Sequence, residues 1–520
     1  LAPGPVAGVW FERPKAARGG CVSFNGYRRG GLFPHTTHQG GKGYPASPEV
    51  ELLLLVAGSL FSGDTFYEAE GERHARFAGL AQDMVRRDPH FVGSLAVFAR
   101  QVLGLRSGPS ALVAHLFWEG PRELAQRVAT QVWLRGDEHL ETLAYTRGQG
   151  WKVRKALKKA VAERLNRMSP QALLKYRAEG RHFRQRDALI LAHPKAPDRE
   201  HAWVYDYLIR GKKASPEALA FVQRVREEDP LWERVISKEG STPEAWRKVL
   251  PHLEGLALIR NLRNLQEHGL LDRREVQDLL LAKLADPERV RGWRIFPHQW
   301  LQALYQLCPR DGVAQGGMRP HPVCQALEGA LEASVPRLDL EGETLILVDV
   351  SGSMYQRMSR KGESTYALAA ATLGAVLYRQ AGGRLFGFSD DLIPVPFSPG
   401  DPLVAMVEHL LTSGGYGTYL ERALGKALRS FGGRRVVILT DEQVADDAYR
   451  PLRPWLLGDD RRRVHVINLA GYAPLAFPQN GISRIGGFSD RLLELLPLLE
   501  AQDPIGWMKA FGREHGLEVG

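Results

Sequence analysis

The fold of the C-terminal part is decided by the stretch Thr344-Leu345-Ile346-Leu347-Val348-Asp349-Val350-Ser351-Gly352-Ser353-Met354. Its apolar run over 344–350 predicts a strand that is buried on both faces. A sheet of strands alternating with helices should follow, because such alternation indicates βαβ units and a mostly parallel, doubly wound sheet. The expected strands are 344–350, 384–389, 435–440, 464–470 and 482–488, and the expected helices are 364–380, 401–412 and 418–430.

Side chains with oxygen donors lie where these strands are predicted to end. Asp349, Ser351 and Ser353 alternate in one tight loop, Asp441 follows the strand 435–440, and Thr418 lies in a glycine-rich loop. Doubly wound sheets bind ligands beyond the carboxyl ends of their strands, so the loops should converge. Because Mg²⁺ prefers oxygen ligands, we predict that these residues hold a divalent metal, with Mg²⁺ as the expected ion.

This pattern resembles the metal-ion-dependent adhesion site of von Willebrand factor A domains, which reads Asp-x-Ser-x-Ser, then Thr, then Asp. The resemblance implies that residues 341–520 form an A domain and that a binding partner supplies a further carboxylate. The second loop departs from many relatives, because it reads Gly-Gly-Tyr-Gly-Thr over 414–418 instead of Gly-Gly-Thr. Two alternatives stay open: the loops keep this shape without a metal, or Ser351 or Ser353 is a nucleophile. A nucleophilic serine needs a nearby base, and the stretch 344–354 contains no histidine.

The chain upstream has a different pattern. From about residue 49 to residue 335, apolar residues recur at helical spacing in segments that glycine or proline interrupts. Helices in series without strands predict stacked helical pairs in an α-solenoid. Residues 18–48 are rich in glycine and proline, so an irregular arm is expected there and not a packed element. The expected helices include 49–60, 73–87, 91–105, 151–167, 169–178, 216–227, 254–267, 273–284 and 320–333.

Composition narrows the class of protein. The 520 residues are 44% hydrophobic and 25% charged, as in ordinary globular proteins. The longest conspicuous uncharged run, 365–378, is too short to span a bilayer, so we expect a buried helix there and no membrane insertion. Cys21, Cys308 and Cys324 form no CxxC pair. We therefore expect no disulfide framework, no cysteine zinc site and a reducing, cytoplasmic location.

Positive charge gathers in one segment. Residues 147–187 carry 13 Lys and Arg against three acidic residues, a surplus of +10 that equals the surplus of the whole chain. On a helix, Lys152, Lys155, Lys158 and Lys159 would share one face. Such a row of cations suits phosphate binding. Nearby aromatic residues could stack on unpaired bases, namely Trp151, Tyr176 and Phe183. The alternatives are a solvated positive face and aromatic side chains that belong to the core.

Several strings in the helical part are similar to the Ro autoantigen family, whose helical module is called TROVE. They are K-A-L-K-K-A-V-A (155–162), L-K-Y-R (174–177), L-A-H-P-K (191–195), A-L-I-R-N-L (257–262) and R-I-F-P-H (294–298). Their order and spacing, together with D-V-S-G-S-M (349–354), make the chain resemble a bacterial Ro orthologue over about residues 20 to 500.

The resemblance implies a monomeric ring, in which HEAT-like repeats over 1–340 are closed by the A domain. It also implies that small noncoding Y RNA binds a basic outer surface, that single-stranded ends of misfolded RNA enter the central hole, and that a 3′-to-5′ exoribonuclease is a partner. By position, Lys175 and His193 match family residues that touch RNA. The spacing over 178–186 differs from the family, so the arginines there are assigned from charge alone. The candidate RNA-binding residues are Lys152, Lys155, Lys158, Lys159, Lys175, Arg177, Arg181, Arg184, Arg186 and His193.

The predicted function is therefore a non-enzymatic RNA-binding scaffold that acts in RNA quality control or maturation. A second hypothesis is a protein-docking module, in which the helical repeats and the metal site both bind proteins. A third is an accessory subunit of a chelatase or ATPase assembly. The chain lacks the string G-x-x-x-x-G-K-[ST], so it is not itself a P-loop ATPase.

Overall fold

The chain forms two compact units. One, here called the helical unit, comprises Leu1–His35, Tyr44–Asp229 and Gln502–Gly520; the other, the sheet unit, comprises Thr36–Gly43 and Pro230–Ala501. The computed structural model describes residues 35–57, 70–178, 183–228, 232–308, 321–335, 338, 340–358, 364–472, 474–478, 481–487, 491–494, 496, 500 and 504–517.

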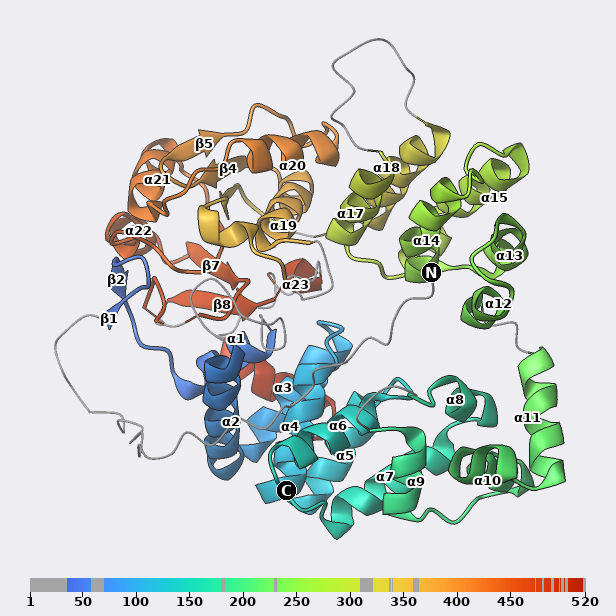
Figure 1. The fold of residues 1–520 in the computed structure, drawn as a ribbon. Helices are drawn as coiled ribbons and strands as arrows, with labels where there is room; N and C mark the ends of the chain where they lie inside the picture. The colour runs from blue at the N-terminus through green and yellow to red at the C-terminus, as the bar shows by residue number, and fades with distance from the viewer. Residues whose placement is uncertain are drawn as a thin grey trace. The chain divides into compact units, whose positions relative to one another are not determined.

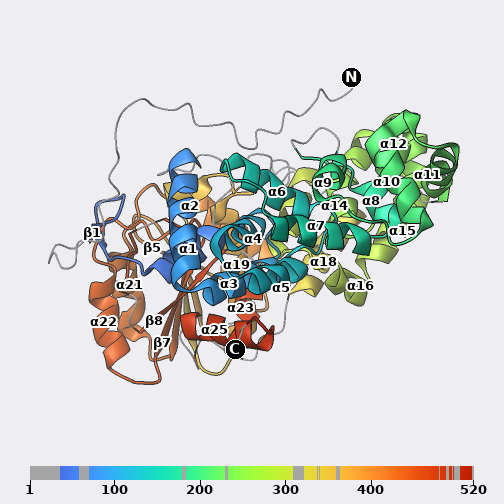
Figure 2. The same ribbon diagram turned by 90° about the horizontal axis from the view of Figure 1, so that it is seen from below.

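The helical unit is built from helices that pack pairwise. Its core includes the pair α3 and α4, most of whose residues are buried. The C-terminal helix α25 packs against α3 (Figure 2). The rings of Trp507 and Phe511 both contact the ring of Phe98, at 5.3 and 5.9 Å between centroids. The helices are α1 (Pro48–Ala57), α2 (Glu70–Arg87), α3 (Pro89–Gln101), α4 (Ser107–Glu119), α5 (Arg122–Val132), α6 (Glu138–Gly148), α7 (Lys155–Arg167), α8 (Pro170–Lys175), α9 (Gln185–Ala192), α10 (Arg199–Arg210), α11 (Pro216–Glu228) and α25 (Pro504–Glu514).

Local chemistry sets where these helices begin. α3 and α8 each start with proline after a capping residue: Asp88 accepts the Phe91 N–H at 3.0 Å, and Ser169 accepts the Ala172 N–H at 3.2 Å. The predicted start of a helix at residue 151 is wrong. Gly150 is left-handed with φ 74°, and Arg154 is extended with φ −68° and ψ 156°, so α7 begins only at Lys155. Lys152 therefore lies before the helix and not on its face.

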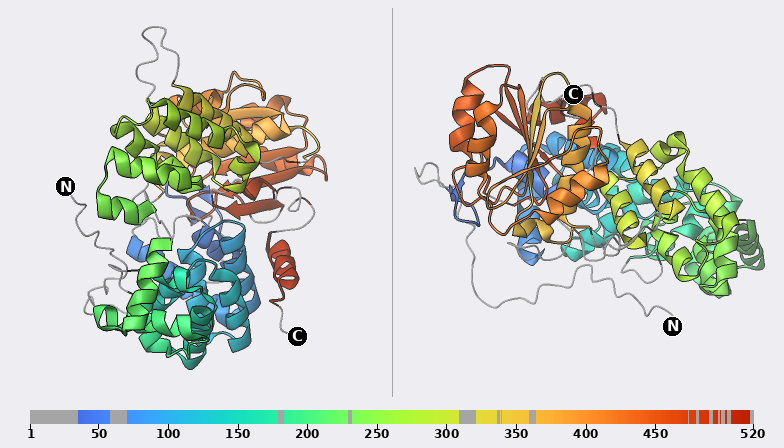
Figure 3. Two further views of the ribbon diagram at one scale, coloured as in Figure 1. Left: turned by 90° about the vertical axis from the view of Figure 1, so that its right-hand side faces the viewer. Right: turned by 90° about the horizontal axis from the view of Figure 1, so that it is seen from above.

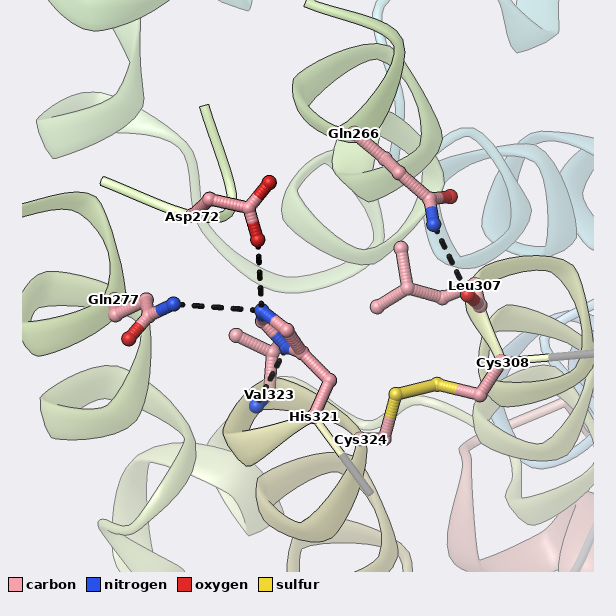
Figure 4. Close-up of a disulfide and its surroundings, with 8 residues drawn as sticks. All are labelled: Gln266, Asp272, Gln277, Leu307, Cys308, His321, Val323 and Cys324. Atoms are coloured by element: carbon pink, nitrogen blue, oxygen red, sulfur yellow. Dashed lines mark hydrogen bonds and ion pairs between the residues drawn. A yellow bond between two sulfur atoms is a disulfide. The ribbon is translucent and has the colours of Figure 1, made fainter. Parts of the chain in front are cut away.

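The helices of the sheet unit confirm three further predictions, since α14, α15 and α18 cover the segments expected at 254–267, 273–284 and 320–333. The sequence predicts no disulfide framework, yet Cys308 and Cys324 form one disulfide with Cα atoms 6.5 Å apart (Figure 4). The end of α17 and the start of α18 bring them together, although 16 positions separate them in sequence. These helices are α12 (Trp232–Glu239), α13 (Pro243–Val249), α14 (Gly255–Glu267), α15 (Arg274–Leu284), α16 (Pro287–Gly292), α17 (Pro297–Leu307) and α18 (Pro322–Ser334).

The sheet has the order β5-β4-β3-β6-β7-β8, and every pairing is parallel except β4 with β5. Helices cover both faces, with α19 and α20 on one and α21 and α22 on the other (Figure 3, right). This confirms the predicted doubly wound fold and the buried helix over 365–378, now α19. The elements are β3 (Thr344–Asp349), α19 (Tyr366–Ala381), β4 (Arg384–Phe388), β5 (Leu392–Pro394), α20 (Leu403–Thr412), α21 (Leu420–Ala427), β6 (Arg435–Thr440), α22 (Tyr449–Leu457), β7 (Arg463–Asn468), β8 (Ile482–Gly486) and α23 (Arg491–Glu494).

Part of the glycine-rich arm is packed, contrary to the prediction for residues 18–48. Two short strands, β1 (His35–Thr36) and β2 (Lys42–Gly43), pair with each other. They bring residues 36–43 against the loop that follows β6, as the blue strands beside the orange-red elements show in Figure 1. Separately, no helix in the described part of the chain is long and apolar enough to cross a membrane.

Candidate metal centre and nucleic-acid interface

The predicted metal ligands lie on adjoining loops at the carboxyl edge of β3 and β6. Asp349 ends β3, and Asp441 follows β6, which is the neighbouring strand in the sheet. The Ser351 and Ser353 hydroxyl oxygens are 3.5 Å apart, and the Ser351 N–H donates to Asp349 Oδ1 at 3.0 Å. The loop that carries Thr418 is bonded to the loop that follows Asp441, because the Thr418 carbonyl oxygen accepts the N–H of Ala445 at 2.8 Å. All five predicted side chains are buried.

The electrostatics of this edge fit a cation. Burial raises the pKa of Asp349 to about 6. Burial, followed by the nearby charge of Asp349, raises the pKa of Asp441 to about 7. Among the described residues, the buried Thr418 hydroxyl oxygen has no hydrogen-bond partner. Among the described residues no group of three or more His, Cys, Asp or Glu side chains could hold a metal, so hydroxyl oxygens must complete any ligand set here. Two carboxylates and three hydroxyls are a donor set that suits Mg²⁺.

Two residues that support this edge were missed by sequence reasoning. Thr440 Oγ1 donates to Asp349 Oδ2 at 2.6 Å and fixes that carboxylate. Asp390 accepts the N–H groups of Tyr416 and Gly417 at 3.2 and 3.0 Å and so holds the loop that carries Thr418. A polar residue at the end of an apolar strand was the available signal for Thr440. The signal for Asp390 was its place directly after the strand 384–389.

Tyr416, which departs from the Gly-Gly-Thr pattern of the A-domain loop, lies outside the set of candidate metal ligands. Tyr416 is 91% exposed, while its carbonyl oxygen accepts the N–H of Gly352 at 3.4 Å. The neighbouring glycines are needed for close approach, because a Cβ on Gly415 would lie 2.2 Å from Asp390 Oδ2. The extra residue therefore projects an aromatic ring into solvent beside the Asp349 loop, and the Thr418 hydroxyl stays buried.

The segment 36–43 forms hydrogen bonds with the loop that follows Asp441. The hydroxyl of Thr37 donates to the carbonyl oxygen of Val444, and the N–H of His38 donates to Gln443 Oε1 at 3.0 Å. The N–H of Lys42 donates to the carbonyl oxygen of Asp446 at 3.2 Å, and its ammonium lies 3.3 Å from Asp447. This segment is therefore part of the support for the predicted metal edge.

The basic residues form a second candidate site, in the helical unit. The structure places Lys152, Lys155, Lys159, Lys175, Arg186 and His193 in exposed positions, and Lys158, Arg177 and Arg184 in half-buried ones. Arg181 lies outside the described residues. Acidic partners lie beside Lys159, which is 3.8 Å from Glu163, and beside Arg184, which is 3.3 Å from Asp187. Within the part of the chain that the structure describes, Lys152, Lys155, Lys158 and Lys175 have no ion-pair partner.

Helix packing brings segments of this basic region together. α7 packs against α9, and α10 packs against both α8 and α9. The amide of Asn166 near the end of α7 donates to the carbonyl oxygen of Lys195 at 2.9 Å. His193 lies two residues earlier, as the left-handed cap of α9 with φ 47°. The His193 turn and the C-terminal end of α7 are therefore neighbours.

Aromatic rings accompany these cations. Trp151 stacks on Trp118 with centroids 5.1 Å apart, and Arg154 lies 4.3 Å from the centroid of Trp118. Tyr176 has Arg135 at 5.2 Å and Lys175 at 5.8 Å from its ring centroid. Phe183 is half-buried. Sequence reasoning identified Trp151 and Tyr176 but missed Trp118, which is distant in sequence from the basic segment.

Two comparisons with known proteins bear on this architecture. A family model described as the TROVE domain matches residues 222–310. The crystal structure of the Deinococcus radiodurans Ro (RSR) protein matches with a TM-score of 0.62 and 22% sequence identity, over 90% of this chain and 100% of that one. This likeness shows a shared fold, and two of the strings that suggested the Ro family, at 257–262 and 294–298, lie inside the matched segment. The TROVE match and the shared fold together confirm the predicted resemblance: residues 222–310 are similar to the TROVE domain, and the fold is similar to that of the Ro protein.

Proposed function

We propose that the chain is a non-enzymatic RNA-binding scaffold whose RNA contacts lie on the basic region of the helical unit. The observation that carries this proposal is the set of Lys152, Lys155, Lys158 and Lys175, which have no acidic partner among the described residues. Surface charges elsewhere in the chain are often paired, as in Arg86 with Glu119 and Lys426 with Asp391. Unpaired cations beside aromatic rings suit a ligand that offers phosphates and bases.

The proposed ligands are small structured RNAs of the Y RNA class and single-stranded or misfolded RNA ends. A-form helices hide their bases in a deep, narrow groove, so recognition should depend on phosphates, shape and unpaired ends. In this proposal the protein presents RNA to a 3′-to-5′ exoribonuclease and works in the cytoplasm. The family resemblance supports these points, and they go beyond the shared fold.

A second proposed activity is metal-dependent docking of a protein at the carboxyl edge of β3 and β6. The buried hydroxyl of Thr418, which has no partner, favours it. Asp349, Ser351, Ser353, Thr418 and Asp441 would hold Mg²⁺, and the ion would supply an open position for a carboxylate of the partner. The exposed ring of Tyr416 would then lie at the rim of the docking surface.

The RNA proposal is tested by the affinity of the full chain for a small structured RNA across a salt series. A slope of about −0.7 to −0.9 per phosphate contacted is expected for log K, where K is the association constant, against log salt. The triple variant K155E/K158E/K175E should bind more weakly and with a smaller slope. The control K238E/R429E/R453E makes the same charge change at exposed positions in the sheet unit. Equal affinities for the two triple variants would contradict the assignment of the basic region.

A further inference from the structure

Two tryptophans and an arginine from different segments form a stack beside the basic region. Trp118 lies near the end of α4, and Trp151 lies in the connection before α7. Their rings are parallel within 2°, with centroids 5.1 Å apart. The guanidinium carbon of Arg154, the capping residue of α7, lies 4.3 Å from the centroid of Trp118.

Trp151 is held in place by the interior of the helical unit. Its backbone N–H donates to the carbonyl oxygen of Thr146 at 3.0 Å. Its ring meets the ring of His115 nearly perpendicularly, with centroids 4.9 Å apart. His115 is itself fixed, because its Nε2 lies 2.9 Å from the hydroxyl of Tyr145, and both residues are buried. The stack therefore rests on a rigid base and needs little ordering when a ligand binds.

Arg154 lies over the ring of Trp118 at the surface of the helical unit. Trp118 is half-buried and Arg154 is exposed. Arg154 has no ion-pair partner among the described residues, so its charge is not neutralised by the protein. Lys155 follows it directly and is also exposed and unpaired. One aromatic face and two free cations thus lie within a few residues of one another.

We propose that Trp118, Trp151 and Arg154 form a stacking subsite for one unpaired nucleobase, and that Arg154 and Lys155 bind the adjacent phosphates. This inference rests on the proposed RNA-binding function and names the part of the RNA that this surface reads. The base stacks against the indole of Trp118 and displaces the guanidinium, which turns toward a phosphate. Every base offers a π-face, so the subsite selects unpaired nucleotides over duplex and tolerates different sequences. A cation–π contact is weak unless it is desolvated, and Arg154 is exposed, so its displacement costs little.

The test uses the full chain with a single-stranded oligouridine RNA of about 12 nucleotides, a length within known single-strand sites, and a duplex RNA of equal length. W118L should weaken binding of the single strand about 5- to 160-fold, the range expected for one stacked base. Binding of the duplex should stay close to the wild-type value. W118F keeps an aromatic face and should restore most of the affinity. Tryptophan fluorescence of the wild type should be quenched by the single strand and not by the duplex.

Two further variants test whether a loss of affinity in W118L comes from misfolding. R154Q changes an exposed side chain, so it should weaken binding of the single-stranded RNA without lowering the melting temperature of the protein. W203L is a matched control, because Trp203 also carries an arginine, Arg199, at 5.1 Å from its ring, but packs against Phe221 and not against a second indole. It should leave the affinity for the single strand unchanged.

The outcomes separate the two proposals. If W118L and R154Q bind the single strand as tightly as the wild type while K155E/K158E/K175E does not, the stacking subsite is wrong and RNA binding stands. Equal weakening of single strand and duplex by W118L would also overturn the subsite, since stacking on an unpaired base cannot explain it. If the wild type binds neither RNA, both proposals fail.

Discussion

The backbone N–H of Gly41 donates to the carbonyl oxygen of Val444 at 3.1 Å. The arm that precedes α1 and the loop that follows Asp441 are therefore joined backbone to backbone, and the hydroxyl of Thr37 reaches the same carbonyl oxygen across 407 positions of sequence. A glycine is required at this contact. A Cβ at position 41 would lie 2.4 Å from the oxygen of Val444 and 2.5 Å from that of Asp446.

The variant G41V should therefore separate the arm from the loop and destabilise the sheet unit. Overpacking of this kind costs about 1–3 kcal/mol of unfolding free energy. Urea denaturation of the full chain measures it. The control is G425A in α21, where a Cβ meets nothing within 4 Å. That variant should be as stable as the wild type or more stable by up to about 1 kcal/mol. Equal stability of G41V and G425A would show that the contact is dispensable.

Substitution of Thr418 by valine should have opposite effects with and without metal. In EDTA the variant should match or exceed the wild type in stability, because a buried hydroxyl without a partner costs about 1–3 kcal/mol. With Mg²⁺ at about 100 times its Kd, the wild type should gain about 2.7 kcal/mol, and the variant should gain much less. Thermal unfolding in the two buffers measures both effects.

The matched control for that experiment is T372V in α19. Thr372 is also buried, but its hydroxyl donates to the carbonyl oxygen of Leu368 at 2.6 Å. T372V should keep the full gain with Mg²⁺. A wild type that shows no gain with Mg²⁺ would favour loops that keep their shape without a metal.

His115 should make the helical unit sensitive to acid. Burial lowers the pKa of His115 to about 3, against an ordinary value of 6.5, and the opposing charge of Glu119 offsets little of this. The folded chain therefore keeps the imidazole neutral while the unfolded chain takes up a proton below pH 6.5. Stability is fully present above pH 6.5 and falls as the pH decreases toward 3, by up to about 1.4 kcal/mol per pH unit.

The variant H115Q removes this proton uptake and keeps a hydrogen-bonding group beside Tyr145. Its stability should fall less steeply between pH 6.5 and pH 4 than that of the wild type, as measured by denaturation at several pH values. The stability of H115Q should still fall with acid, because His139 contributes in the same way: burial lowers the pKa of His139 to about 4. Parallel pH profiles for H115Q and the wild type would refute this role for His115.

Reduction of the Cys308–Cys324 disulfide should destabilise the sheet unit. The bond closes a loop with a sequence separation of 16, for which chain-entropy estimates give about 3 kcal/mol. Dithiothreitol should lower the melting temperature of the wild type. The variant C324A should melt at that lower temperature both with and without dithiothreitol. Thiol titration of the unreduced, denatured chain should find only Cys21. Three free thiols in that experiment would restore the expectation drawn from the sequence.

Much of the sheet unit could be predicted because its signals are local. The apolar run that ends at Asp349 and the similar run before Asp441 identify buried parallel strands and place both residues at one edge. A strand such as β5 was missed because it is short, half-exposed and antiparallel, and only its pairing with β4 defines it. Lys152 was placed on the wrong element because charge periodicity continued through residues that Gly150 and Arg154 keep out of the helix.

Residue types at short spacing were enough to predict the parallel sheet, the five candidate metal ligands and the concentration of charge over 147–187. The tertiary structure decided what those residues meet. It buried the Thr418 hydroxyl without a partner, set Trp118 on Trp151, paired Cys308 with Cys324 and laid Gly41 against Val444. The partners in these contacts come from separate elements of the chain, and only packing of those elements brings them within a few ångströms.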